Sequence, residues 1–256
     1  MHVVITGASS GIGACLAREY HSAGARVTVV ARRHGLLTKL QQDLGDRCEV
    51  VVSDLSVADP AAWVAQLGRI DVFINNAGFN ITGPFDFADD AEVARLFRVN
   101  LLAPIALARA VVPAMAARGS GAVVNISSVA GLVPPAGMAC YSAAKAGLAA
   151  FSEALHAELR PAGVHVLTVY PGPIDNGVPH DSLELYGKDS MAGAVPIGTA
   201  ANLAKAIRVS VERKSARLIF PRFYSAARAF PSIARWLVTR FTPPLRALPA
   251  GGRAVG

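Results

Sequence analysis

The chain has 256 residues, of which 52% are hydrophobic and 17% are charged, and its formal net charge is +7. This length and composition predict a single globular domain with a substantial core, and no apolar run reaches the roughly 20 residues of a membrane-spanning helix, so neither a transmembrane helix nor a signal peptide is expected. Three cysteines without a CxxC pair argue against a disulfide framework and favour a reducing cytoplasm, and six scattered histidines predict no metal site.

The positive charge is concentrated in the C-terminal region. Eleven Lys and Arg residues but only one acidic residue, Glu212, follow residue 204, so this region carries +10 and the first 204 residues carry −3. A protein that binds nucleic acid would more usually spread such charge over a folded face, so nucleic acid is not the expected partner.

Short apolar runs alternate with helical patterns along the chain. Strands are expected at 2–6, 26–31, 48–53, 70–75, 121–127, 164–170 and 217–220, and helices at 12–23, 57–67, 90–118 and 200–212, with others after the second and fifth strands. Near-continuously apolar strands are typical of a parallel sheet buried on both faces. The pattern therefore predicts an α/β fold, a Rossmann-like doubly wound seven-stranded parallel sheet with helices on both faces, in a single domain. Pro104 and Pro113 are expected to bend or break the long helix.

A glycine-rich turn, TGASSGIG at 6–13, joins the first strand to the first helix. Gly7, Gly11 and Gly13 allow a tight turn and a close approach to a pyrophosphate, while the helix N-terminus supplies free N–H groups and a positive dipole. A nucleotide is the expected ligand, and a merely tight turn is the alternative.

The second strand ends in Ala31, Arg32 and Arg33. A site for NAD usually has an acidic residue here, which binds the ribose hydroxyls and would repel a 2′-phosphate. Guanidinium groups instead offer charge-assisted hydrogen bonds to a phosphate, so the sequence favours NADP(H) over NAD(H). Two solvated arginines at a helix entry are the alternative.

The run YSAAK places Tyr141 and Lys145 four residues apart in a helical pattern. Residues at this spacing lie on the same helix face, and a cation beside a phenol lowers its pKa from about 10. A solvated amphipathic pair is the alternative for an isolated motif of this kind.

These motifs resemble those of the classical short-chain dehydrogenase/reductase (SDR) family, whose glycine turn reads TGxxxGxG. The resemblance implies that Tyr141 is the general acid/base and that Lys145 lowers its pKa and binds the nicotinamide ribose. It also implies that Ser128, thirteen residues before the tyrosine, and Asn100 on the long helix complete the catalytic set. Ser127 is the neighbouring alternative, but its side chain is expected to point to the opposite face.

The resemblance, which covers roughly residues 1–220, further implies that the residue at the Arg32 position binds the 2′-phosphate with the help of Ser9 or Ser10, and it implies a wider set of cofactor contacts. These are Gly7, Ser9, Ser10, Gly11, Ile12, Gly13, Arg32, Arg33, Asp54, Leu55, Asn76, Ala77, Gly78, Tyr141, Lys145, Pro171, Gly172, Ile174 and Asn176. Asn75 and Asn76 could equally be turn residues that cap the fourth strand. Asn176 replaces the threonine of the family's PGxxxT pattern, which puts that contact in question.

Residues 177–198 correspond to the family's variable substrate lid. They are rich in turn formers and lack a repeated basic pattern, which favours a moderately apolar carbonyl compound or alcohol over a phosphorylated substrate. Cys140 has no base or metal partner in the sequence and is expected to pack or to line the pocket.

The catalytic domain is expected at 1–221 and a basic amphipathic tail at 222–256. In the tail, aromatic and aliphatic residues are interleaved with arginines, and Pro231 separates two short helical patterns. Such a segment suits peripheral contact with an anionic membrane, but it could equally pack over its own pocket or a neighbouring subunit.

The combined interpretation is an NADP(H)-dependent oxidoreductase that transfers a hydride between nicotinamide and a carbonyl or alcohol of a moderately apolar, lipid-like substrate. The alternative is a non-catalytic nucleotide-sensing or scaffold protein on the same fold. Such proteins often lose the tyrosine or the lysine, and both are present here. The resemblance also implies a homodimer or homotetramer, and the expected location is cytoplasmic, with a peripheral membrane contact as a hypothesis.

Overall fold

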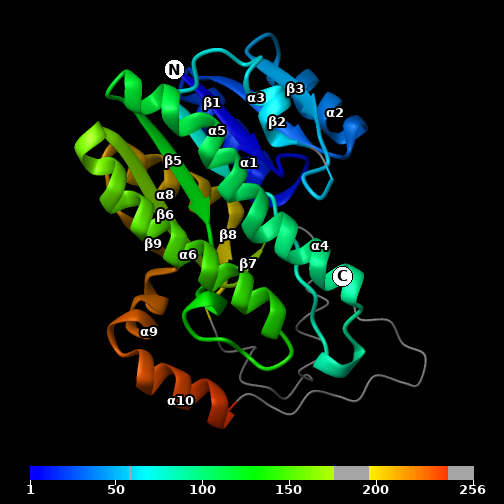
Figure 1. Cartoon of the computed structure of the whole chain (residues 1–256), viewed down its shortest axis with the longest axis vertical. Helices are drawn as coiled ribbons and strands as arrows, with labels where there is room; N and C mark the ends of the chain where they lie inside the picture. Colours follow the sequence, from blue (N-terminus) through cyan, green and yellow to red (C-terminus); the bar gives the residue numbers. More distant parts are fainter. Residues whose placement is uncertain (58, 176–195, 242–256) are drawn as a thin grey trace.

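A seven-stranded parallel sheet forms the middle layer of the protein in the computed structural model, which describes residues 1–57, 59–175 and 196–241 (Figure 1). The strands are β1 (His2–Thr6), β2 (Arg26–Ala31), β3 (Cys48–Val52), β4 (Val72–Asn75), β5 (Gly121–Ile126), β6 (Val164–Pro171) and β9 (Arg217–Phe220). Their order is β3-β2-β1-β4-β5-β6-β9, and all neighbours are parallel. Every residue of β1 and β6 is buried, as expected for near-continuously apolar strands in a parallel sheet.

Helices cover both faces of the sheet. One face carries α1 (Gly11–Ser22), α2 (His34–Leu44) and α8 (Ala200–Glu212), which contribute Leu16, Leu37 and Leu203 to one core cluster. The other face carries α3 (Pro60–Val64), α5 (Ala103–Ala117) and α6 (Ala139–Leu159), and α4 (Asp90–Phe97) packs against α6. The predicted doubly wound fold is confirmed.

The long helical pattern differs from its prediction. A π-helical segment, η2 (Arg98–Leu102), connects α4 to α5 directly before Pro104. Proline lacks the N–H that an α-helix would use and clashes with the carbonyl one turn earlier, so the wider turn meets Pro104 without ending the helix. Pro113 lies inside α5, and the structure records no break there.

The same run, Asp90–Ala117, is long and apolar enough to span a membrane by length and composition alone. Its residues Leu107, Val111 and Met115 are buried against the sheet. This packing is that of a core helix in a doubly wound fold.

Other element boundaries agree with the predicted ones to within two residues, except for those of α3. The helix expected at 57–67 is reduced to Pro60–Val64, and Gly68 adopts a positive φ of 65° shortly after it. A small parallel pair, β7 (Ile174–Asp175) and β8 (Gly198–Thr199), has no clear signal in the sequence. After β9 the chain forms α9 (Ser225–Ala229) and α10 (Pro231–Phe241), which confirms two short helices separated at Pro231.

The strand order reverses between β1 and β4. The chain winds outward from β1 through β2 to β3 on one side, and from β4 to β9 on the other. In open α/β sheets this reversal leaves a crevice beyond the carboxyl ends of the strands, where ligands bind.

Candidate functional site

A cavity of about 360 Å³ occupies this crevice. Twelve predicted cofactor residues line it: Gly7, Ser9, Ser10, Gly11, Ile12, Arg32, Arg33, Asp54, Leu55, Asn76, Ala77 and Gly78. The other residues of its lining are Val30, Ala31, Ser53, Phe79 and Val99. Sequence reasoning missed these five, although each lies within one residue of a predicted site position or the end of β2.

The glycine turn is shaped by close backbone contacts. Gly7 has a φ of 67°, and a Cβ atom there would lie 2.7 Å from the Cα atom of Ala77. A Cβ atom on Gly13 would lie 2.3 Å from the carbonyl oxygen of Gly7. Neither position accepts a side chain without displacing backbone, so the glycines hold the turn against the end of β4 and keep the crevice open.

Hydrogen bonds of Thr6 and Asn76 stabilise this contact, and no pattern in the sequence had pointed to Thr6. The Thr6 hydroxyl accepts hydrogen bonds from the backbone N–H groups of Asn76 and Ala77, both at 3.0 Å. The Asn76 amide donates to the Thr6 carbonyl at 2.9 Å. Asn75 is the last residue of β4, and its buried amide donates to Asn125 at 2.8 Å. Asn76 was predicted either to contact the cofactor or to cap the fourth strand, and it borders the cavity. Asn75 instead stabilises the sheet.

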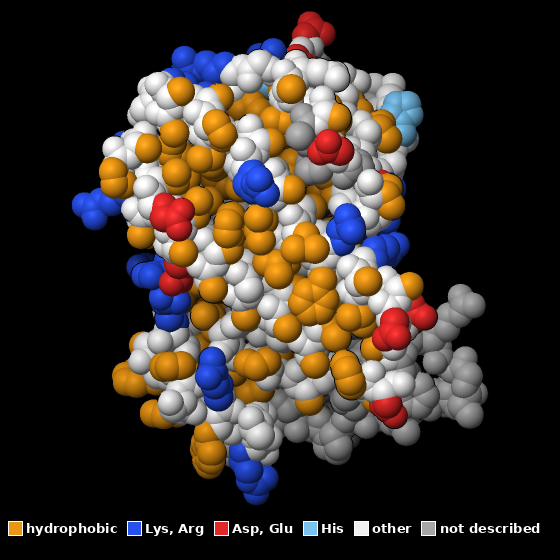
Figure 2. All heavy atoms as spheres, in the orientation of Figure 1, with side chains coloured by type: hydrophobic (Ala, Val, Ile, Leu, Met, Phe, Trp, Pro, Cys, Tyr) orange, Lys and Arg blue, Asp and Glu red, His pale blue; other side chains and the backbone are white. Residues whose placement is uncertain are grey.

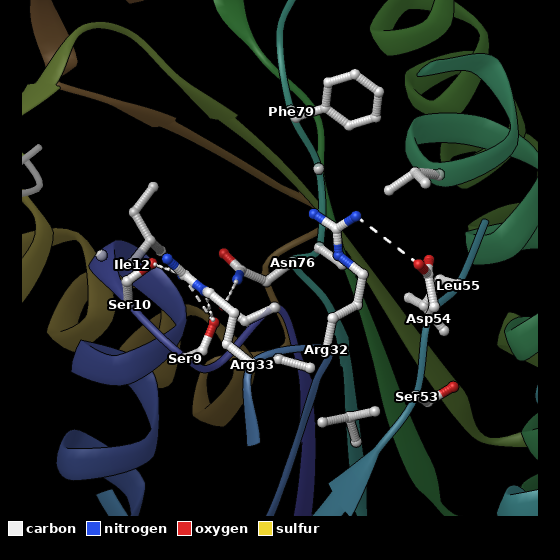
Figure 3. A pocket seen from close by; sticks show the side chains of 17 residues that line it. Ser9, Ser10, Ile12, Arg32, Arg33, Ser53, Asp54, Leu55, Asn76 and Phe79 are labelled. Atoms are coloured by element: carbon white, nitrogen blue, oxygen red, sulfur yellow. Dashed lines mark hydrogen bonds and ion pairs between the residues drawn. The ribbon is translucent and has the colours of Figure 1, made fainter. Parts of the chain in front are cut away.

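The two arginines after β2 have different surroundings (Figure 3). Arg33 reaches across the mouth of the glycine turn and donates to the Ser9 hydroxyl at 2.8 and 3.1 Å and to the Ser10 hydroxyl at 2.5 Å. Arg32 points instead toward Asp54, with 3.7 Å between Nη1 and Oδ2. The resemblance assigned the phosphate contact mainly to the Arg32 position, whereas the cluster of an arginine with two serines is centred on Arg33.

This cluster suits a phosphate. The two serine hydroxyls accept hydrogen bonds from Arg33, so their own O–H groups remain available as donors. Ser10 is also the N-cap of α1 but makes no side-chain hydrogen bond to that helix. A guanidinium with two hydroxyls beside a helix N-terminus matches the acceptor-rich surface of a phosphate group.

Tyr141 and Lys145 lie in the first two turns of α6, as their spacing predicts. Lys145 is 4% exposed, its Nζ donates to the Ile126 carbonyl at 2.9 Å, and burial lowers its pKa to about 8. Burial raises the pKa of the Tyr141 phenol, and a hydrogen bond with Ser128 acts in the opposite direction. The pKa of Tyr141 is therefore raised overall, whereas Lys145 was expected to lower it. The Lys145 Nζ atom lies 5.8 Å from the centre of the Tyr141 ring.

The two serines after β5 are distinguished by their direction. Ser128 is the N-cap of a short 3₁₀ turn, η3 (Val129–Gly131), and accepts a hydrogen bond from Ala130 N–H at 3.1 Å. The Ser127 hydroxyl donates to the backbone carbonyl of Lys145 at 2.7 Å. Ser128 therefore lies beside the phenol, while Ser127 fixes α6, as the alternation of side chains along a strand predicts.

Asn100 is fully buried in the π-helical segment η2. Its amide donates to the Phe79 carbonyl at 2.8 Å and accepts from the Phe79 N–H at 3.2 Å. A Cβ atom on Gly78 would lie 2.4 Å from the Asn100 Oδ1 atom and 3.2 Å from the Lys145 Nζ atom. Asn100 and Lys145 thus meet at Gly78, which also lines the cavity.

The cavity lining does not include Pro171 at the end of β6, or Gly172 and Ile174 after it. Gly172 N–H donates to the Phe220 carbonyl at 2.7 Å, and Ile174 is buried in β7. A Cβ atom on Gly172 would lie 2.5 Å from a ring carbon of Tyr224, a residue that sequence reasoning did not connect with this motif. Asn176 and most of the expected lid lie outside the described residues.

Comparisons with known proteins indicate the family of this chain. A family model described as short chain dehydrogenase matches residues 1–184. The chain is 33% identical to a dehydrogenase/reductase SDR family protein 7-like from Anopheles gambiae, over 93% of this chain and 82% of that protein. It is 34% identical to 3-ketodihydrosphingosine reductase from Bos taurus, over 68% of this chain and 56% of that enzyme. A short-chain dehydrogenase from Sphingobium yanoikuyae, solved in complex with NADPH, superposes with a TM-score of 0.77 at 32% identity, over 96% and 98% of the two chains.

Proposed function

The chain belongs to the classical short-chain dehydrogenase/reductase family of nicotinamide-dependent oxidoreductases, and we propose that this member uses NADP(H) to reduce the carbonyl group of a moderately apolar, lipid-like substrate. The observation that carries the proposal is the meeting of Asn100 and Lys145 at Gly78. Gly78 lines the cavity, whereas Asn100 and Lys145 do not line it themselves; they contact Gly78 from behind, so they lie one residue away from the space that the cofactor would fill.

The choice of NADP(H) rests on the Arg33, Ser9 and Ser10 cluster. These side chains would bind the 2′-phosphate, and the end of β2 carries no acidic residue that would repel it. The solved relative from Sphingobium yanoikuyae is an NADPH complex, which supports the same cofactor for this chain.

Tyr141 would act as the proton donor. The carbonyl carbon would receive a hydride from bound NADPH, and the negative charge that develops on the carbonyl oxygen would require a proton. Burial raises the pKa of Tyr141 and keeps the phenol protonated at neutral pH. The phenol O–H would donate to that oxygen, Ser128 would orient it, and the Lys145 ammonium would stabilise the phenolate that remains.

The substrate class is proposed from two observations. The lid sequence lacks a basic pattern for a phosphorylated substrate. A relative that covers most of this chain is named for the reduction of 3-ketodihydrosphingosine, a long-chain ketone. A long-chain ketone is therefore the first compound to test.

The test is a screen of aldehydes and ketones, including long-chain 3-ketones, in which NADPH oxidation is followed by absorbance. Tyr141→Phe should lower kcat at least about a hundredfold while leaving NADPH affinity nearly unchanged. The matched control is Tyr20→Phe. It also removes one tyrosine hydroxyl, but from a residue of α1 that is buried in the protein core away from the site. A wild-type chain that binds NADPH but reduces no carbonyl compound would favour the nucleotide-sensing alternative.

A further inference from the structure

The C-terminal segment 222–241 combines apolar and basic side chains at the carboxyl end of the sheet. Figure 1 shows α9 and α10 projecting beyond α6 at this end, and Figure 2 shows orange and blue side chains on the same part of the surface. We propose that this segment, the C-terminal docking surface, binds an anionic lipid bilayer. The surface is defined by Arg222, Phe223, Phe230, Ile233, Arg235, Trp236 and Leu237.

The apolar part of the surface follows helical spacing. Phe230, Ile233 and Leu237 are 61%, 57% and 43% exposed and lie on one face at and along α10. Ala234 and Val238, on the adjoining face, are partly buried against the protein. Phe223 and Trp236 add exposed aromatic rings, a residue type that is enriched at membrane interfaces. Five large apolar side chains exposed within residues 223–237 are unlike the isolated apolar residues of an ordinary surface.

The charge of the segment complements an anionic surface. Residues 222–241 contain four arginines and no acidic residue, and residues 242–256 add Arg246 and Arg253, again without an acid. Each basic residue near an anionic bilayer strengthens partitioning about fivefold. Nucleic acid would use the arginines but not the exposed apolar side chains, and a symmetric contact with a second copy would bring two surfaces of the same positive charge together.

The inner side of the segment is attached to the body of the protein. Arg228 forms an ion pair with Glu153 at 3.0 Å, and its guanidinium lies 5.9 Å from the centre of the Tyr170 ring. The Tyr224 hydroxyl donates to the Pro196 carbonyl at 3.2 Å, and Arg235 Nε donates to the Leu132 carbonyl at 3.4 Å. These contacts fix α10 with Phe230, Ile233 and Leu237 facing solvent. The docking surface can therefore contact a membrane without a change in the fold.

The position of the surface connects it to the reaction site. Arg235 contacts Leu132, which follows the η3 turn, and Ser128 is the N-cap of that turn. A bilayer bound here would lie next to the turn whose N-cap hydrogen-bonds to Tyr141. If the proposed function holds, a lipid-like carbonyl compound would enter the site from the membrane.

Vesicle co-sedimentation of the full chain tests this inference. We expect binding to phosphatidylcholine vesicles that contain phosphatidylglycerol, weaker binding to phosphatidylcholine alone, and a loss of binding as salt is raised. The double substitution Ile233→Ser and Leu237→Ser should lower the partition coefficient roughly a hundredfold, about tenfold for each side chain. The matched control, Leu36→Ser with Val57→Ser, removes two apolar side chains that are exposed elsewhere and should change it less than about twofold.

Several results would overturn the proposal. Equal recovery of the wild-type chain in the supernatant with and without anionic vesicles would do so, as would equal loss in both double variants. A change in oligomer mass caused by the Ile233 and Leu237 substitutions, with no vesicle binding by the wild type, would identify a contact between copies. Retention on immobilised DNA without vesicle binding would identify a nucleic-acid site.

The failure of this inference can be told apart from the failure of the proposed function. The Ile233 and Leu237 double variant should reduce a water-soluble ketone at the wild-type rate and lose activity only on a ketone embedded in anionic vesicles. A chain that reduces soluble ketones but never binds vesicles contradicts the docking surface alone. A chain that binds vesicles but does not oxidise NADPH with any of the carbonyl compounds tested contradicts the proposed function alone.

Discussion

Replacing Arg33 with glutamine tests the contact proposed for the 2′-phosphate. The guanidinium of Arg33 bridges Ser9 and Ser10 with contacts of 2.5 to 3.1 Å, so it is already oriented at the glycine turn. Glutamine keeps a hydrogen-bonding side chain but removes the charge. Arg32→Gln is the matched control, because Arg32 leaves the same strand end but points toward Asp54.

The expected effect follows from the loss of a hydrogen bond to a charged group. Such bonds contribute about 1.5–3 kcal/mol, which corresponds to a tenfold to hundredfold weaker affinity. NADH lacks the phosphate, so its affinity should change by less than about twofold. The preference for NADPH over NADH should therefore fall by about one to two orders of magnitude in Arg33→Gln and by less in Arg32→Gln.

The assay is a fluorescence titration of each variant with NADPH and with NADH. Equal weakening of both cofactors by Arg33→Gln would refute the proposed phosphate contact. A larger loss of NADPH affinity in Arg32→Gln than in Arg33→Gln would show that the phosphate lies on the Asp54 side. A wild-type chain that prefers NADH would refute the choice of cofactor altogether.

Three further substitutions probe the structure around the site. Asn100→Ala leaves the N–H and C=O of Phe79 without their side-chain partner, so the free energy of unfolding in urea should fall by about 2–5 kcal/mol, and a loss below about 0.5 kcal/mol would contradict this. Burial lowers the pKa of Lys145 to about 8, so between pH 8 and 10.5 the unfolded chain keeps a proton that the folded chain has released, and this group adds about 2–4 kcal/mol to the free energy of unfolding. Burial raises the pKa of Cys48 to about 11, which acts in the opposite direction. The free energy of unfolding of the wild type minus that of Lys145→Met should therefore rise over this pH range, and a constant difference would contradict the lowered pKa. Gly172→Ala places a methyl group 2.5 Å from the Tyr224 ring and should lower the free energy of unfolding by about 1–3 kcal/mol. Combining it with Tyr224→Leu should relieve part of this loss. Additive losses in the double variant would argue against the contact.

The agreement between sequence and fold is closest where one local pattern decides the element. Strands β1, β2 and β9 have the predicted boundaries, because each is an apolar run that ends at a turn. The helix expected at 57–67 is shorter because part of its apolar pattern lies in turns. The periodicity of apolar residues indicates which side chains are buried, not which secondary structure carries them. Turns next to a sheet also bury side chains, so the same pattern can extend past the end of a helix.

The π-helical segment shows what local pattern does not contain. Pro104 indicated a disturbance in the long helix, but not its kind. The wider turn carries Asn100, which is bonded to both backbone groups of Phe79, a residue 21 positions away. This partner follows β4 and becomes a neighbour only when the sheet is assembled.

By itself, the sequence determined the parallel sheet, the glycine turn and the direction of Ser128 against Ser127, because these follow from apolar runs, backbone freedom and the alternation of side chains along a strand. It also placed Tyr141 and Lys145 on one helix face. Only the tertiary structure decided that Arg33 rather than Arg32 contacts Ser9 and Ser10, that Asn100 and Lys145 meet at Gly78, and that Tyr224 packs on Gly172. Each of these contacts joins segments that are distant in the chain, and the packing of whole helices and strands sets their geometry.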